Sequence, residues 1–221
     1  MKRVFTLAVA TALACLTAQA GVITLGTFSV NPQATFLNES ASDSNVAALF
    51  IQLSSTTCGI SNCVVAPNGA ELVLIAGGNI CFAAGPSMCG SAAGQIGAAF
   101  DANNTLTPSS PSTQNFNRLG GSINAGVGSI VDSNLNEFGS SISTNIPNDF
   151  FVPGGAGQTV FVPGGAQWLA LGVLDSVFKD NSGSPTVTIE EIQAPAPEPA
   201  TLGLLGAGLL GLAALRRRRA L

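Results

Sequence analysis

The sequence predicts an all-β protein, built as an antiparallel β-sandwich and flanked by two apolar terminal segments. Between those segments, short β-prone runs alternate with stretches of Gly, Ser, Thr, Asn and Pro. Turn signals recur about every ten residues, which is typical of antiparallel sandwiches and barrels. We therefore expect strands over residues 22–30, 47–53, 71–75, 79–82, 158–162, 168–174 and 186–192.

Two stretches compete as helices, and one short motif is repeated. Residues 45–53 and 124–138 have apolar spacing that a helix could use, but the second carries two glycines, which weaken a helix. The sequence Phe-Val-Pro-Gly-Gly-Ala occurs at 151–156 and again at 161–166. Each Val-Pro enters a Gly-Gly turn, so we interpret the repeat as two successive strand-turn units of one sheet.

The amino terminus has the layout of a secretory signal peptide. Two basic residues precede an apolar run over 4–16, and a small-x-small pattern ends at Ala20, before Gly21. This order of charge, apolar run and small residues fits signal peptidase. We expect residues 1–20 to be removed between Ala20 and Gly21, and the rest of the chain to be exported.

Residues 21–194 are long enough for one domain with a buried core. Their basic residues are Arg118 and Lys179, against eleven acidic ones, so the exported part carries a net charge of about −9 and is unsuited to nucleic acid. The chain has no His and no Tyr, which excludes Ser-His and Cys-His catalysts. A Ser-Lys dyad would need Lys179, and carboxylate pairs stay possible. We predict that the protein is not an enzyme, with an envelope hydrolase as the remote alternative.

Four cysteines follow the signal peptide, at Cys58, Cys63, Cys81 and Cys89. An even number in an exported chain favours two disulfides. Three pairings are possible, of which we favour the local ones, Cys58 to Cys63 and Cys81 to Cys89. A metal site is the weaker interpretation, because the spacing is not that of paired C-x-x-C ligands.

The carboxyl terminus combines a short motif, an apolar run and a basic cluster. The motif and the cluster are Pro197, Glu198 and Pro199, and Arg216, Arg217, Arg218 and Arg219, with the uncharged run 200–215 between them. As a helix, this run would be about 24 Å long, short of a hydrocarbon core of about 30 Å, so it can span only if the arginines snorkel. Arginines that stay in the cytoplasm would place the body of the chain on the far side of the inner membrane.

This layout over residues 195–221 resembles the PEP-CTERM sorting signal of Gram-negative bacteria. The resemblance implies a temporary inner-membrane anchor with a transmembrane helix over 200–215. It also implies cleavage near Pro-Glu-Pro by an exosortase, and release of the body to the cell surface or extracellular matrix.

One loop has residues that could bind a metal ion. An apolar strand runs into Asp175, and four residues separate it from Asp180-Asn181, which precede Ser-Gly-Ser. Two carboxylates and a carboxamide are hard oxygen donors that suit Ca²⁺ better than Mg²⁺. In the alternative interpretation, Asp180 and Asn181 cap backbone amides in a turn without metal. Asp101, with Asn103 and Asn104, is interpreted as a polar turn residue.

Residues 164–192 resemble the carboxy-terminal part of LecA-like bacterial lectins, which are calcium-dependent galactose-binding sandwiches. The resemblance implies a jelly-roll or lectin-like fold and Ca²⁺ ligands from the side chains of Asp175, Asp180 and Asn181. It also implies ligands from the carbonyl of Val177 and, through a weaker upstream match, from that of Phe82. The loop is shorter than in the lectins, and the chain lacks their sugar-binding His, so galactose specificity does not follow.

These expectations combine into an exported protein of the cell surface or biofilm matrix. Exosortase is the expected processing partner, and glycans or exopolysaccharide are the expected ligands, bound with the help of calcium. The alternative is a structural matrix or surface protein with no specific ligand.

Overall fold

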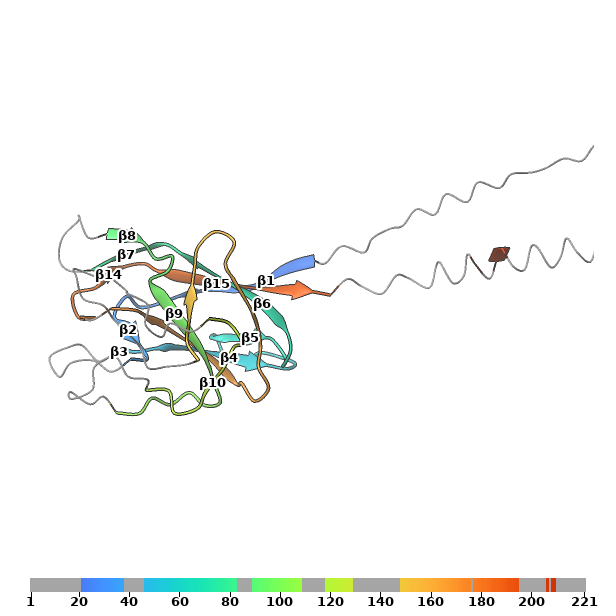
Figure 1. The fold of residues 1–221 in the computed structure, drawn as a ribbon, viewed down its shortest axis with the longest axis horizontal. Coiled ribbons are helices and arrows are strands. Elements are labelled where there is room, and N and C mark those ends of the chain that lie inside the picture. Colours follow the sequence, from blue (N-terminus) through green and yellow to red (C-terminus); the bar gives the residue numbers. More distant parts are fainter. Residues whose placement is uncertain are drawn as a thin grey trace, which may run out of the picture. The chain divides into compact units, whose positions relative to one another are not determined.

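The computed structural model describes residues 21–37, 46–82, 89–108, 118–128, 148–175, 177–194, 206 and 208–209. Residues 22–193 form one compact unit, here called the body, while the terminal segments 1–21 and 194–221 form a separate unit. The described part of the body consists of strands and loops (Figure 1), which confirms the all-β prediction.

The first main sheet has four strands in the order β1-β15-β6-β12. β6 pairs antiparallel with both neighbours, and Leu72 lies between Glu191 of β15 and Val160 of β12. The strands are Gly21–Ser29 (β1), Thr186–Gln193 (β15), Glu71–Gly77 (β6) and Gln158–Phe161 (β12).

The second main sheet follows the order β10-β9-β13-β4-β5, and β11 also pairs with β9. Its centre is β13, which pairs antiparallel with β9 and β4. The strands are Ser122–Ile123 (β10), Ile96–Asp101 (β9), Trp168–Val173 (β13), Leu49–Ser54 (β4), Cys63–Val65 (β5) and Phe150–Val152 (β11).

Two smaller sheets complete the described strands. β7 (Asn79–Cys81) lies between β14 (Ser182–Gly183) and β8 (Cys89–Ser91). β2 (Ala34–Thr35) pairs with β3 (Val46–Ala47). That pair and β4 with β5 are parallel, so the prediction of a purely antiparallel body is wrong at these two places.

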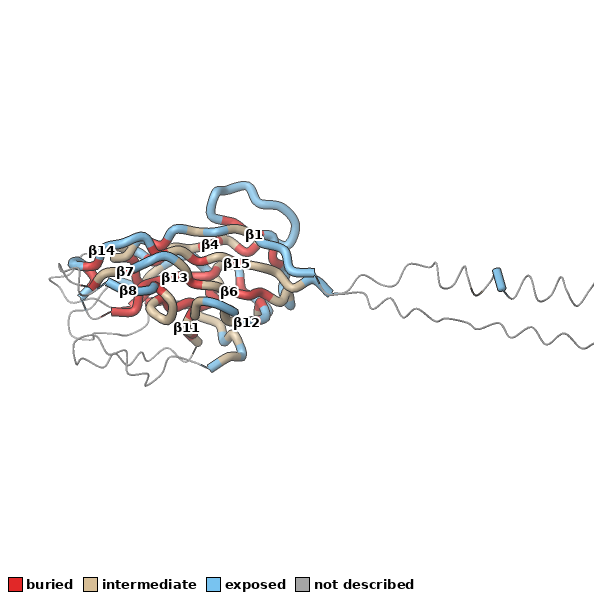
Figure 2. Tube along the Cα trace, turned by 90° about the horizontal axis from the view of Figure 1, so that it is seen from above, coloured by how far each residue is buried: buried red, intermediate tan, exposed pale blue. Residues whose placement is uncertain are grey.

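The two main sheets share one apolar core (Figure 2), an arrangement that fits a sandwich. Alternate residues point inward, as the two-residue period of a strand requires. The core receives Leu72 and Leu74 from β6, Ile189 from β15, and Leu169 and Phe100 from the second sheet.

The second sheet is also covered on its other face. There Ala99 and Ala170 pack with Phe36, Leu174 and Phe178 in a second apolar cluster. Gly172 also lies on this face, where the backbone of Thr35 and Phe36 packs directly against it. A Cβ at position 172 would lie 3.0 Å from the Thr35 Cα and 3.1 Å from the Phe36 N.

All seven predicted strands are present, with bounds that differ by up to two residues, and 45–53 forms strands β3 and β4 instead of a helix. Most of the other helix candidate, 124–138, lies outside the described residues. The interpretation of the Phe-Val-Pro-Gly-Gly-Ala repeat is wrong in one respect. The first copy contributes β11 to the second sheet and the second copy contributes β12 to the first sheet, so the turn between them changes sheets.

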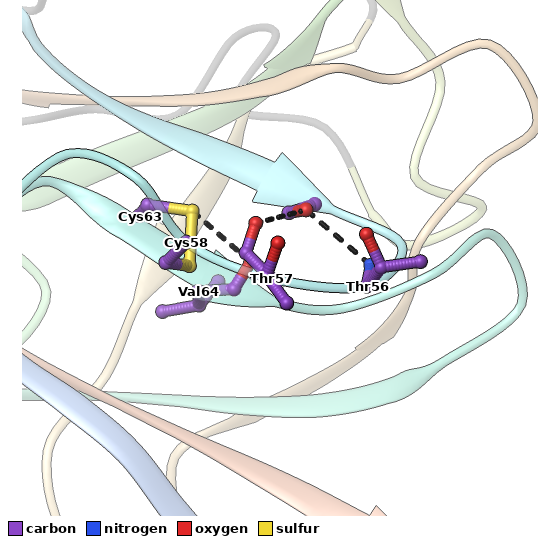
Figure 3. The surroundings of a disulfide bond; sticks show 6 residues. Thr56, Thr57, Cys58, Cys63 and Val64 are labelled. Atoms are coloured by element: carbon purple, nitrogen blue, oxygen red, sulfur yellow. Dashed lines mark hydrogen bonds between the residues drawn. A yellow bond between two sulfur atoms is a disulfide. The ribbon is translucent and has the colours of Figure 1, made fainter.

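The cysteines form Cys58–Cys63 and Cys81–Cys89, which fits the local pairing favoured from the sequence. The first disulfide closes the connection between β4 and β5 (Figure 3), where the Ser54 hydroxyl donates to the Thr57 carbonyl at 2.7 Å and accepts from the Thr56 N–H at 3.3 Å. The second joins β7 to β8, directly opposite one another in the ladder. Both disulfides therefore hold short connections at strand ends.

Candidate functional site

The candidate site begins where β13 ends. β13 is central in its sheet and buried from Leu169 onward, and the chain runs from it into Asp175, whose side chain is 2% exposed. The buried carboxylate thus lies at the end of a rigid strand, as the sequence predicts.

The loop after Asp175 is held by backbone and by one side chain from another segment. The Asn181 N–H donates to the Phe178 carbonyl at 3.2 Å, and Phe178 is buried in the second apolar cluster. Gln33, in the turn before β2, donates from Nε2 to the Lys179 carbonyl at 2.9 Å and to the Asn181 carbonyl at 3.4 Å. Gln33 is a positioning residue that no sequence motif indicated, because its contact depends on how the sheets pack.

Asn181 has an unusual environment for an amide side chain. It is 3% exposed, and neither Oδ1 nor Nδ2 has a hydrogen-bond partner anywhere in the described structure. Unpaired buried polar groups carry a penalty of about 1–3 kcal/mol each. The turn-capping alternative from the sequence therefore finds no support at Asn181.

The upstream segment that ends at Phe82 reaches the same place. β14 pairs antiparallel with β7, with Ser182 opposite Cys81 and Gly183 opposite Ile80. Continued by one step, this register places Asn181 opposite Phe82, which is 8% exposed. The structure thus brings Phe82 beside the Asp180-Asn181 turn across about a hundred residues of sequence.

The other two residues predicted as ligands lie at the surface. Asp180 is exposed, and Val177 is 41% exposed. Within the described ranges, no three His, Cys, Asp or Glu side chains come together as a metal cluster. A cation in this loop would therefore need the Asn181 amide and backbone carbonyls in addition to carboxylates.

A second buried carboxylate lies outside the loop, at the end of β9. Asp101 is fully buried, its Oδ1 accepts from the Ala102 N–H at 2.9 Å, and its Oδ2 has no hydrogen-bond partner among the described residues. Burial raises the pKa of Asp101, although the backbone amides of Ala102, Asn103 and Gly121 act to lower it. The turn interpretation holds for Asn103, which accepts from the Thr105 N–H at 3.0 Å, whereas Asp101 is the last residue of a strand.

This pKa predicts how stability depends on pH. A carboxyl whose pKa is raised in the folded state binds protons more readily there than in the unfolded chain, so stability rises as pH falls through the folded pKa toward the ordinary value of 3.8. Asp101→Asn should remove this rise and leave a flatter profile. Thermal unfolding between about pH 7 and 4 tests it, with Glu190→Gln on the partly exposed part of β15 as the matched control. Equal profiles for wild type and Asp101→Asn would contradict the expectation.

The sorting residues lie outside the described residues. This applies to Pro197, Glu198, Pro199, the four arginines and Ala20, while Gly21 is the first residue of β1. Within the predicted helix 200–215, the described positions Gly206, Gly208 and Leu209 are helical. In the described part of the chain we found no helix with the length and apolar character needed to cross a bilayer.

Comparison with known proteins gave one result, and it concerns the tail. Residues 195–219 match the family model described as the PEP-CTERM protein-sorting motif. No curated protein and no solved structure matched the chain, so the likeness of the body to lectins gains no support beyond the residues already named. The chain therefore carries, at residues 195–219, a PEP-CTERM sorting signal, which indicates an exported protein that an exosortase sorts to the cell surface.

Proposed function

We propose that the body is an adhesive module of the cell surface or extracellular matrix, and that the loop after β13 binds Ca²⁺ to assist glycan binding. The observation that supports this proposal is Asn181, whose buried Oδ1 lacks a hydrogen-bond donor in the described structure. A cation would supply the missing partner, and Ca²⁺ accepts carboxylate, amide and carbonyl oxygens alike.

The proposed ligands are Asp175 and Asn181 at the inner end of the loop, with Asp180 and the Val177 carbonyl at its exposed rim. Phe82, opposite Asn181, would offer its carbonyl. Few carboxylates contribute, so we expect a Kd in the range of extracellular calcium modules, about 10⁻⁴–10⁻³ M. The exposed rim leaves a coordination position that sugar hydroxyls could reach.

The position of the loop suits display at a surface. β15 begins at Thr186, just after the loop, and ends at Gln193, just before the sorting signal. Its residues span about 25 Å at the rise of a strand. The proposed binding loop and the tail therefore leave opposite ends of β15, so that a tethered body would present the loop away from its attachment.

Calcium titration by calorimetry of residues 21–194, which are the body with one flanking residue at each end, tests the proposal. We expect saturable binding and a higher Tm with Ca²⁺ than with chelator, since a ligand that binds only the folded state stabilises it. Asp175→Asn and Asn181→Leu should both abolish binding. Without Ca²⁺, Asn181→Leu should be at least as stable as wild type, because it removes two unpaired polar groups.

Glu190→Gln changes a carboxylate on β15 and serves as the control that should bind normally. Retention on an exopolysaccharide column, with and without chelator, then tests the glycan step. Absence of both heat and thermal shift would refute the calcium proposal and leave the alternative, a structural matrix protein with no specific ligand. Calcium binding with chelator-insensitive retention would refute only the glycan step.

A further inference from the structure

The first strand of the body, β1, lies beside its last strand, β15. The Val30 N–H donates to the Pro185 carbonyl at 3.0 Å, and the hydroxyls of Thr27 and Thr188 are hydrogen bonded at 3.0 Å. Because residue numbers fall along β1 as they rise along β15, the two strands are antiparallel, and Val22 lies next to the end of β15. Figure 1 shows the start of β1 and the end of β15 side by side at one end of the body.

The end of β15 lies level with the start of its other neighbour, β6 (Glu71–Gly77). The register of β15 with β6 runs from Thr186 opposite Gly77 to Glu191 opposite Leu72. Continued by one step, this register places Ile192 opposite Glu71, the first residue of β6, and only Gln193 extends beyond it, beside the start of β1. We call residues 22–24 with 192–193 the terminal ribbon.

The terminal ribbon is a weak part of the fold. Val22 is 58% exposed and Ile23 is 39% exposed, so the start of β1 buries little apolar surface. Two-stranded ribbons without further packing are marginally stable in water, and segments with few buried contacts open more readily than the core. The ribbon should therefore open without unfolding of the two main sheets.

The sorting signal follows the ribbon almost at once. Ala194 alone separates the end of β15 from residue 195, where the family match begins. From Gln193 to Pro197 the chain can reach at most about 14 Å, even when fully extended. Proteases that bind their substrates as extended strands need several residues on each side of the cleaved bond. On the amino-terminal side, these residues include the last part of β15.

We propose that the terminal ribbon is the surface at which the exosortase engages the body, and that Ile192 and Gln193 must leave β1 before cleavage. Pairing within the ribbon then competes with processing and limits its rate. Pairing within the ribbon limits the access of the exosortase to the bond near Pro197. It does not alter the chemistry of cleavage. This inference depends on the sorting signal and is independent of calcium.

The charge near the ribbon favours a protein over a lipid surface as the partner. Glu190 and Glu191 precede Ile192 on β15, and Glu71 begins the adjacent strand β6. Acidic side chains gain nothing from anionic lipid headgroups, which attract basic segments. The apolar Val22 and Ile23 are therefore better suited to a protein cleft than to the bilayer surface.

Pulse-chase processing of the full chain in exosortase-containing cells tests the proposal. Six Gly and Ser residues inserted between Ala194 and Pro195 would add about 20 Å of reach, so that the inserted residues and not β15 occupy the protease. We expect processing several-fold faster than in wild type. Thr24→Pro, which removes a backbone N–H and weakens β1 pairing, should also accelerate processing, because cleavage of a transiently opened state follows the population of that state.

Gln158→Pro makes the corresponding change in β12, the opposite edge strand of the same sheet, and should leave the rate unchanged. The Gln158 N–H faces Leu74 of β6, because the Val162 N–H donates to the Ala70 carbonyl and ladder bonds alternate along the strand. Mass spectrometry of the amino terminus checks that signal-peptide cleavage is normal in each variant. Unchanged processing in both the insertion and Thr24→Pro would overturn the proposal. Equal acceleration by Thr24→Pro and Gln158→Pro would also overturn it, because general destabilisation would then explain the effect.

Discussion

A chain truncated after Ala194 is expected to be exported and yet not sorted. Its predicted signal peptide, residues 1–20, would be intact, whereas the whole PEP-CTERM match over 195–219 would be gone. Since the compact unit ends at Gln193, the truncation should leave the fold unchanged. We expect loss of exosortase processing and of delivery to the cell surface, measured by cell fractionation and by mass spectrometry of the carboxyl terminus.

Replacement of the four terminal arginines, 216–219, by serine separates the basic cluster from the rest of the signal. Positive charge fixes the orientation of a short membrane segment, so its loss should release unprocessed chain. Lys179→Ser, in the exposed loop of the body, is the charge control and should be sorted normally.

Normal surface delivery of the chain truncated after Ala194 would contradict the first prediction, because it would show that sorting information resides in the body.

Phe100→Ala is expected to have the largest effect on stability. Phe100 is fully buried on β9 between the two main sheets, opposite Leu169, and its ring centroid lies 6.0 Å from that of Phe150. Loss of a buried phenylalanine removes its transfer free energy and leaves a cavity, together about 3–5 kcal/mol. This is a large part of the 5–15 kcal/mol by which domains are typically stable.

Denaturant unfolding of the oxidised body measures this loss. Phe161→Ala is the matched control, because Phe161 is 56% exposed at the end of β12 and contributes little to the core. We expect a change within about 0.5 kcal/mol for the control. A similar small change for Phe100→Ala would contradict the shared core of the two sheets.

Strands in which apolar and polar residues alternate clearly could be predicted from the sequence. A strand made largely of small residues could not. β15 and β12 have clear two-residue patterns between turn residues, so their existence followed from sequence. β9, with Gly97, Ala98 and Ala99, has no such signal, yet it is a central strand. Gly97 and Ala99 are needed as small residues because Phe36 and Leu174 pack against their face of the strand, where a Cβ at Gly97 would meet Leu174 at 2.8 Å. Only packing between distant segments explains them.

Only part of the candidate site, likewise, could be predicted from the sequence. The strand entering Asp175 and the turn after Asp180 could be predicted, because both depend on neighbouring residues. The burial of Asn181, its contact with Gln33 and its position opposite Phe82 could not, since each depends on which strands pair. Calcium binding by this loop stays a prediction, which the calorimetric titration tests.

By itself, the sequence determined the destination of this protein. The sorting signal is recognised as a linear segment, so apolar length, charge and the Pro-Glu-Pro motif suffice to identify it. The predicted signal peptide depends on the same kind of local pattern. The tertiary structure decided what no local pattern contains: that the first and last strands of the body, β1 and β15, lie side by side, and that the candidate loop lies at the other end of β15 from the sorting signal. These placements depend on strand pairing between residues far apart in the chain, which is set by burial of a common core.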